Sequence, residues 1–143
     1  MSERYVVGDW GTTHLRLYLI QGDQVLDVRD GVGIGRLTAP AAQVLGGIIA
    51  QWVELPPPIQ VVLGGMASSR NGLQELPYLP APADAPSWAG AARTVAVDSL
   101  TVLLSTGIQC GDDVRGFDVM RGEEAQIFGA MQLAPELLSL IHI

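Results

Sequence analysis

The sequence contains no lysine, and this absence excludes several classes of protein. All eight basic residues are arginine, against fifteen acidic residues, which gives a net charge of −7. A chain this acidic lacks the broad positive surface that nucleic-acid binding requires. The Walker-A phosphate loop needs a lysine, so that type of nucleotide site is excluded as well. We therefore expect no nucleic-acid partner.

Cysteine and long apolar runs are also scarce. Cys110 is the single cysteine, so no disulfide can form within the chain, and this favours a reducing compartment. No apolar stretch reaches the ~18 residues of a membrane span. The N-terminal residues lead into a short apolar run without the pattern of a signal peptide. These features predict a cytoplasmic protein with no membrane partner.

The residues that are present indicate a folded domain. Hydrophobic residues make up 48% of the 143 residues and charged residues 16%, a balance typical of a globular chain with its own core. Seventeen glycines and nine prolines indicate many tight turns.

The first third of the chain has the pattern of an antiparallel meander followed by a helix. Three short runs, at 5–8, 15–20 and 24–29, read as strands joined by turns at 9–13 and 21–23. Residues 30–40 are rich in glycine but do not match the dinucleotide fingerprint GxGxxG, and we expect a mobile loop there. Residues 40–53 have the spacing of an amphipathic helix.

The rest of the chain completes a mixed sheet. Residues 59–63 read as a strand buried on both faces, reached by a helical crossover and therefore parallel to the first. Residues 72–88 read as a long ordered loop, 94–97 and 101–104 as strands, and 105–116 as a loop. Residues 119–134 read as a helix with Ile127, Phe128, Met131 and Ala134 on its apolar face. The predicted fold class is α/β.

The clearest chemical motif is the segment 9–16, Asp-Trp-Gly-Thr-Thr-His-Leu-Arg. A carboxylate ends one strand, a glycine turn follows, and hydroxyls begin the next strand. Backbone N–H groups and hydroxyls of Gly11, Thr12 and Thr13 can face phosphate oxygens, with Arg16 adding charge. Asp9 can hold Mg²⁺, which usually takes one or two carboxylates and keeps several waters. The alternative is an ordinary hairpin turn beside a surface aspartate.

Three motifs together resemble a known family. The pattern Asp-x-Gly-Thr-x-x-x-Arg at 9–16 is similar to the first phosphate motif of the actin, hexokinase and sugar kinase superfamily. The segment 64–72, Gly-Gly-Met-Ala-Ser-Ser-Arg-Asn-Gly, is followed by Pro-Tyr-Leu-Pro at 77–80. The segment 118–126 reads Asp-Val-Met-Arg-Gly-Glu-Glu-Ala-Gln. In this order and at these distances they resemble the 2-dehydro-3-deoxygalactonokinase family over about residues 5–134.

That resemblance implies a fold and a reaction. The fold is a ribonuclease-H-like (actin-like ATPase) domain, with a mixed sheet, three antiparallel N-terminal strands and flanking helices. The reaction is ATP-dependent phosphorylation of 2-dehydro-3-deoxy-D-galactonate to its 6-phosphate in galactonate catabolism, with ATP and Mg²⁺ as the implied cofactors. The alternatives are another sugar or sugar-acid kinase of the superfamily, or a non-catalytic sugar-acid-binding module.

The implied substrate is a carboxylate with several hydroxyls. Arg70, in a Gly- and Ser-rich loop, is a candidate carboxylate clamp because guanidinium binds carboxylate bidentately. Acids at the start of the last predicted helix complement its dipole, but two glutamates and an arginine exceed what capping requires. Our candidates are Asp9 and Glu123 for catalysis, Asp9 for the metal, Gly11, Thr12, Thr13 and Arg16 for phosphates, and Ser69, Arg70, Arg121 and Glu124 for substrate.

Members of this superfamily have two related domains with ATP between them. We expect residues 1–134 to be the N-terminal domain and the C-terminal ATP-binding domain to be missing. Residues 138–143 resemble read-through translation of a sequencing-library transposon end, so 135–143 are expected to be a non-native or truncated tail. The missing half would be the main partner, and the chain alone is expected to be inactive. The oligomeric state is left open.

Overall fold

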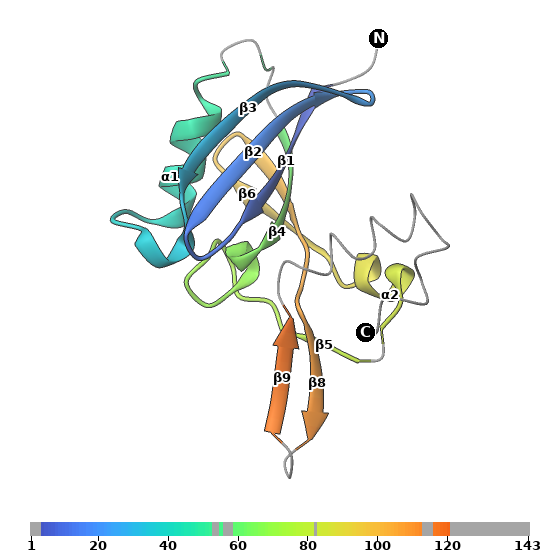
Figure 1. Cartoon of the computed structure of the whole chain (residues 1–143). Coiled ribbons are helices and arrows are strands. Elements are labelled where there is room, and N and C mark those ends of the chain that lie inside the picture. The colour runs from blue at the N-terminus through green and yellow to red at the C-terminus, as the bar shows by residue number, and fades with distance from the viewer. Residues whose placement is uncertain (1–3, 53–54, 56–58, 82, 113–115, 121–143) are drawn as a thin grey trace.

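A mixed six-stranded sheet forms the body of the molecule, with strand order β3-β2-β1-β4-β7-β6. Figure 1 shows this sheet in the computed structural model, which describes residues 4–52, 55, 59–81, 83–112 and 116–120. Antiparallel and parallel pairs both occur, so the α/β class with a mixed sheet is confirmed.

The first three strands form the predicted antiparallel meander. They are β1 (Arg4–Trp10), β2 (His14–Gln21) and β3 (Gln24–Val32). Gly22 has φ +62°, a left-handed conformation that glycine adopts without strain, and it makes the tight β2–β3 turn. The register shifts between Leu19 and Ile20, so one extra residue enters β3 at this bulge.

The segment between β3 and the first long helix differs from our prediction. Residues 30–32 continue β3, and residues 34–36 form the 3₁₀ helix η1 (Ile34–Arg36), whose Ile34 is buried. The expected mobile loop at 30–40 is therefore wrong for its first part. The reason is tertiary: backbone hydrogen bonds from Gly33, Ile34 and Gly35 tie the segment to the β1–β2 turn.

The predicted crossover helix is α1 (Ala41–Ile49), with Pro40 as its N-cap. It leads to β4 (Ile59–Gly65), which pairs in parallel with β1. The helix ends four residues before the predicted bound at 53, and residue 53 itself lies outside the described part. No helix in the described part of the chain is long and apolar enough to cross a membrane.

The strands β6 (Arg93–Val97) and β7 (Leu100–Leu104) confirm the two predicted in this region. They form an antiparallel hairpin, and β7 also pairs in parallel with β4. Asp98, in the hairpin turn, has φ +52°, the region that aspartate tolerates better than most residues. Three parallel strands, β1, β4 and β7, therefore end at one edge of the sheet.

A small second sheet projects beyond that edge (Figure 1). It contains β5 (Leu79–Pro80), β8 (Ile108–Asp112) and β9 (Gly116–Met120). The loop predicted at 105–116 is therefore wrong, because cross-strand pairing with β5 and β9 makes 108–112 a strand. Residues 119 and 120 belong to β9, so the predicted helix 119–134 does not include them, and residues 121–134 lie outside the described part.

The predicted loop 72–88 also contains regular structure besides β5. The short helix α2 (Ala85–Gly90) is capped by Asp84, whose Oδ1 accepts a hydrogen bond of 2.8 Å from the N–H of Ser87. Trp88 donates from Nε1 to the carbonyl of Thr106 over 2.9 Å. This bond attaches α2 to the chain that leaves β7.

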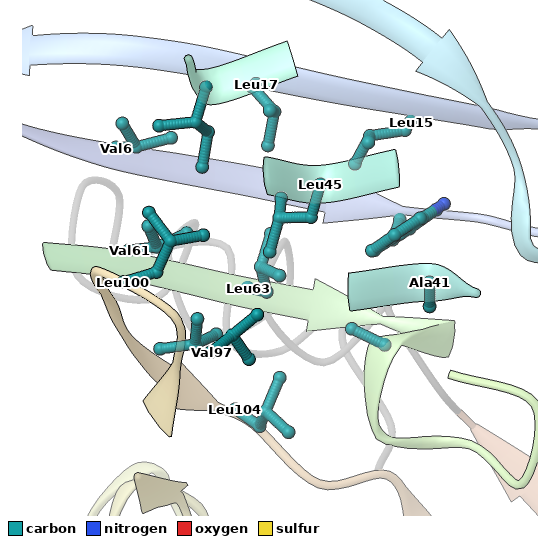
Figure 2. Packing of buried hydrophobic residues seen from close by; sticks show 14 of the residues in the cluster. Val6, Leu15, Leu17, Ala41, Leu45, Val61, Leu63, Val97, Leu100 and Leu104 are labelled. Carbon is teal, nitrogen blue, oxygen red and sulfur yellow. The ribbon is translucent and has the colours of Figure 1, made fainter. Parts of the chain in front are cut away.

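The core lies between α1 and one face of the six-stranded sheet. Figure 2 shows Leu45 of α1 among Leu15, Leu17 and Leu63 from β2 and β4. All four side chains are fully buried, and burying an aliphatic side chain of this size contributes about 1.5–3 kcal/mol. The apolar residues on one side of helix 41–49 thus pack against the alternating apolar residues of the strands.

Among the residues that the structure describes, only one face of strand β4 is covered, whereas we predicted burial on both faces. Val61 and Leu63 are buried in the core, whereas Val62 between them is 39% exposed. Its neighbour on β7, Leu103, is also 39% exposed. The run of apolar residues suggested two covered faces, but within the described residues only the face toward α1 is covered.

A cluster of polar side chains connects β3 to the residues that follow α1. Trp52 donates from Nε1 to Asp27 Oδ2 over 2.8 Å, and Arg29 lies 3.3 Å from the same oxygen. Arg29 also donates to Gln51 Oε1 over 2.9 Å. The Trp52 hydrogen bond, then that from the N–H of Val28, holds the pKa of Asp27 below its usual value.

This cluster predicts a pH-dependent contribution to stability. Because the folded state lowers the pKa of Asp27, its ionised form is stabilising above the unfolded pKa of about 3.9, and the contribution is lost as pH falls through the folded pKa. Urea midpoints of Asp27→Asn should lie below those of the parent chain at pH 7 and converge with them once the pH has fallen below the folded pKa of Asp27. Glu75→Gln, which removes an exposed loop carboxylate, is the control. A constant difference between Asp27→Asn and the parent across this range would contradict the prediction.

Candidate functional site

The candidate site lies at the edge where the parallel strands β1, β4 and β7 end. Asp9 is opposite Gly64, and Trp10 is opposite Gly65, in the β1–β4 register. The β1–β2 turn and the loop after β4 are therefore neighbours in space, although some fifty residues separate them in the sequence. Ligands of α/β sheets bind preferentially at such carboxyl ends.

Asp9 is placed on the outer face by strand alternation. Gly8 and Trp10 are buried on the core side, so Asp9 between them is exposed on the opposite face. A Cβ on Gly8 would lie 2.5 Å from Leu17 Cδ2 and 2.7 Å from Leu63 Cδ2. A side chain there would have to push these leucine side chains aside, so glycine favours the close packing of β1, and that packing places the Asp9 carboxylate on the outer face.

The predicted phosphate turn is held rigidly from one side. The carbonyls of Gly11, Thr12 and Thr13 accept hydrogen bonds of 2.9–3.0 Å from Ile34, Gly35 and Gly33. Since these carbonyls are occupied, the exposed side chains of Thr12 and Thr13 are the groups that face outward. Their hydroxyls can donate to phosphate oxygens.

Arg16 reaches the same face but is already paired. It lies opposite Asp9 on one side and Asp30 on the other. Its Nε donates to Asp30 Oδ1 over 2.9 Å, and hydrogen bonds to Asp30 and Tyr18 raise the pKa of Arg16 above its usual value. Both partners are more than half exposed. Exposed ion pairs of this kind are weak, so a phosphate group can compete with Asp30.

Gly65 links Asp9 to the second predicted segment. It has φ +81°, and a Cβ there would lie 2.7 Å from Asp9 Oδ1 and 2.6 Å from the carbonyl oxygen of Trp10. Glycine is therefore required both by the backbone conformation and by the close approach of β1. The Asp9 carboxylate lies directly against the residue from which the Ser69–Arg70 loop begins.

That loop is folded on itself. It starts with the 3₁₀ helix η2 (Met66–Ser68), and Ser69 donates from Oγ to the carbonyl of Met66 over 2.6 Å. Gly72 packs against the carbonyl of Ala67, where a Cβ would lie only 2.3 Å away. Arg70 is exposed within this compact loop. Ser69 thus has a turn-forming bond, and Arg70 is the charged group that the loop presents to solvent.

Two features of this edge escaped our sequence analysis. One is Asp30, the ion-pair partner of Arg16, which we had assigned to a loop. The other is Ser105, directly after β7, whose N–H donates to the carbonyl of Leu63 over 3.1 Å. Its Oγ is buried and has no hydrogen-bond partner within the described part of the chain. A polar residue directly after the predicted strand 101–104 was the signal available for Ser105.

The third predicted segment cannot be placed. Arg121, Glu123 and Glu124 lie outside the described residues, and their roles stay predictions. Among the residues that the structure describes, no three His, Cys, Asp or Glu side chains gather as a metal centre. One exposed carboxylate, Asp9, nevertheless fits Mg²⁺, because this ion usually keeps several waters and takes one or two carboxylates.

A surface hollow of about 450 Å³ lies elsewhere, beside the amino ends of β4 and β7. Its lining includes Gly46 and Gly47 of α1 and the turn residues Asp98 and Ser99. None of the predicted site residues lines it. Its wall is mainly small and apolar, which gives no chemical reason to place a phosphate or sugar acid there.

The family resemblance of the three motifs agrees with comparisons to known proteins. Residues 9–142 match the model of the family described as 2-keto-3-deoxy-galactonokinase. The chain belongs to this family. The resemblance inferred from the three motifs is thereby confirmed.

Two curated relatives have names that match this family. The chain is 39% identical over 141 residues to the 2-dehydro-3-deoxygalactonokinase of Escherichia coli (strain K12). This match covers 96% of this chain and 46% of the relative. It is 33% identical over 129 residues to the "probable 2-dehydro-3-deoxygalactonokinase" of Rhizobium meliloti (strain 1021), covering 88% of this chain and 42% of the relative. The chain thus spans less than half the length of each.

A solved structure supports the fold. It is that of a "putative 2-dehydro-3-deoxygalactonokinase protein" from Sinorhizobium meliloti, with a TM-score of 0.80 and 32% identity. The match covers 90% of this chain and 42% of that one. The arrangement of β1, β4 and the loop after β4 therefore occurs within a fold that this family shares.

Gly65 provides a sharp test of the site's construction. Gly65→Ala should lower the free energy of unfolding by roughly 1–3 kcal/mol, because alanine disfavours this left-handed backbone, and more if Asp9 must move. Gly46→Ala is the control, since nothing lies within 4 Å of a Cβ there, and mid-helix alanine should stabilise by about 0.5–1 kcal/mol. Both are measured by urea denaturation. Equal midpoints for Gly65→Ala and the parent chain would show that this contact is not required.

Proposed function

We propose that this chain is the N-terminal part of a 2-dehydro-3-deoxygalactonokinase, which transfers a phosphoryl group from ATP to 2-dehydro-3-deoxy-D-galactonate and forms the 6-phosphate. The observation that carries the proposal is the meeting of Asp9, the 11–13 turn and the Ser69–Arg70 loop at one edge of the sheet. A kinase must hold phosphate and acceptor side by side, with reacting atoms about 3–3.5 Å apart.

The strand arrangement supports the finer fold proposal. Three antiparallel strands are followed by β4 and β7, both parallel to β1, in the order β3-β2-β1-β4-β7. We infer a ribonuclease-H-like, actin-like ATPase domain from this order. Residues 1–134 would be its N-terminal domain. The partner domain, which would hold the adenosine, would be the C-terminal half that the relatives have.

In the proposed reaction, the terminal hydroxyl oxygen attacks the γ-phosphorus. The new P–O bond forms as the bond to the β-phosphate bridging oxygen breaks, ADP leaves, and the hydroxyl proton passes to a base. Thr12, Thr13 and Arg16 would hold phosphate oxygens, whereas Gly11, predicted to do the same, would only shape the turn because its N–H donates to the carbonyl of His14 over 2.8 Å. Mg²⁺ bound beside Asp9 would neutralise phosphate charge. Phosphoryl transfer depends mostly on such positioning and charge stabilisation.

The acceptor side would be formed by the second and third motifs. Arg70 would clamp the sugar-acid carboxylate bidentately, and Ser69 would contact a hydroxyl. Arg121 and Glu124 would complete the substrate contacts, while Glu123 would orient the reacting hydroxyl. Because ATP and small sugar acids are both cytoplasmic metabolites, we place the enzyme in the cytoplasm.

The 143-residue chain alone should have no measurable kinase activity, whereas a protein completed with the C-terminal half of the Escherichia coli relative should turn over. The reason is that half of an interdomain cleft offers no adenosine pocket and cannot close to exclude water. A coupled ADP-release assay with 2-dehydro-3-deoxygalactonate measures both proteins. Comparable turnover by the short chain would refute the proposal that it is half of the enzyme. Preference of the completed protein for another sugar acid would instead correct the substrate.

Two substitutions in the completed protein separate the two sides of the site. Asp9→Asn should lower kcat by about 10²–10³-fold, the range seen when one group that stabilises transition-state charge is removed. Arg70→Ala should raise KM for the sugar acid while leaving KM for ATP nearly unchanged. Asp23→Asn, at the β2–β3 hairpin tip, is the matched control. If Asp9→Asn behaves like Asp23→Asn, the phosphate side of the site is wrongly placed.

A further inference from the structure

The short connection between β7 and β8 holds together parts of the molecule that are far apart in the sequence. At its start, the N–H of Ser105 donates to the carbonyl of Leu63 in β4 over 3.1 Å. At its end, the carbonyl of Gly107 accepts a hydrogen bond of 2.8 Å from the N–H of Leu79 in β5. Thr106 lies between the two and is only 2% exposed. The connection therefore joins the six-stranded sheet to the three-stranded one.

Thr106 makes two hydrogen bonds from this buried position. Its hydroxyl donates to the carbonyl of Pro77, and its own carbonyl accepts from Nε1 of Trp88 over 2.9 Å. A buried hydroxyl costs free energy of desolvation that its hydrogen bond must offset. Valine would fill nearly the same space without a hydroxyl, so the bond to Pro77 is what threonine adds at this position.

Pro77 lies at the far end of the loop that carries Arg70. Directly before it, Leu76 donates from its N–H to the carbonyl of Ser68 over 3.0 Å, and both residues are buried. This bond closes the loop on itself. A shift of Pro77 is therefore passed back to the residues around Arg70.

The near end of the same loop is fixed at the candidate site, where Gly65 lies against Asp9. With one end held at Gly65 and the other at Pro77, the exposed Arg70 between them keeps a defined place relative to Asp9. A site that works by positioning depends on such fixation, because a small displacement of a binding group weakens its contact with the substrate.

We propose that Thr106 is a positioning residue for the acceptor side of the site, an inference that rests on the kinase function proposed above. Its hydroxyl holds Pro77 and thereby keeps the loop in the conformation in which Arg70 meets the sugar-acid carboxylate. Because Thr106 is buried, it acts through Arg70 and does not touch the substrate itself. It lies outside all three sequence motifs.

Kinetics of the protein completed with a C-terminal half test this role. Thr106→Val should raise KM for the sugar acid roughly 3–10-fold, the loss expected for one intramolecular hydrogen bond. KM for ATP and kcat should stay nearly unchanged. Thr106→Ser, which keeps the hydroxyl, should behave like the parent, and Thr94→Val on the exposed side of β6 is the matched control. In an Arg70→Ala background, Thr106→Val should have no further effect.

Hydrogen exchange in the 143-residue chain separates this proposal from the proposed function. Thr106→Val should speed exchange of the Leu76 amide roughly fivefold or more, while the amides of α1 stay protected, because only the loop is loosened. Thr106→Ala removes the same hydroxyl and replaces Thr106→Val if circular dichroism shows that the valine variant does not fold.

The outcomes are distinct. A completed protein that does not phosphorylate the sugar acid would refute the proposed function, and the role of Thr106 with it. An active protein in which Thr106→Val leaves KM for the sugar acid or exchange at Leu76 unchanged would overturn the positioning role alone. An equal rise of both KM values, or a further loss in the Arg70→Ala background, would show a general structural role instead.

Discussion

The structure depends on the placement of β1 between two partners of opposite direction. It pairs antiparallel with β2 and parallel with β4, so its alternating side chains decide what lies on each face. Val6 and Trp10 enter the core with zero exposure, and Gly8 lets Leu17 and Leu63 close over the strand. Asp9 then has only the outer face available. The same packing that stabilises the sheet therefore delivers a carboxylate to its edge.

Core and candidate site are coupled through backbone more than through side chains. The 11–13 turn is bonded to residues 33–35, and Gly65 lies against both Trp10 and Asp9. Loops normally move more than the elements that they connect. Here two loops and a strand end interlock at the carboxyl edge, a degree of pre-organisation that suits a site whose chemistry is mainly positioning.

The sequence predicted the local elements well and the long-range pairing less well. The meander, α1, β6 and β7 follow from alternation and helical spacing, which are local signals. The Arg16–Asp30 pair was not predictable in this way. In a regular hairpin that starts from the pair Gln21 and Gln24, Arg16 would lie opposite Arg29. The bulge at Leu19 and Ile20 shifts the pairing by one residue, so Arg16 instead lies opposite Asp30. Strand β8 was missed because one partner, β5, is only two residues long and far away in the sequence, and the other, β9, overlaps the start of the predicted helix 119–134. Three motifs carried the family assignment, but their spacing alone could not show that Gly65 touches Asp9.

The two ends of the β2–β3 hairpin have opposite consequences for anyone who modifies this protein. At one end, Gly22 and Asp23 form a tight turn far along the strands from Asp9 and Thr12. At the other, Val32 accepts a hydrogen bond from Trp10 Nε1, and Gly33 packs against Thr12 so closely that no side chain fits. Exposed loop tips accept insertions, whereas interlocked backbone does not. A fluorophore, affinity tag or fused domain therefore belongs between residues 22 and 23, where it reports on the molecule while leaving the 11–13 turn intact.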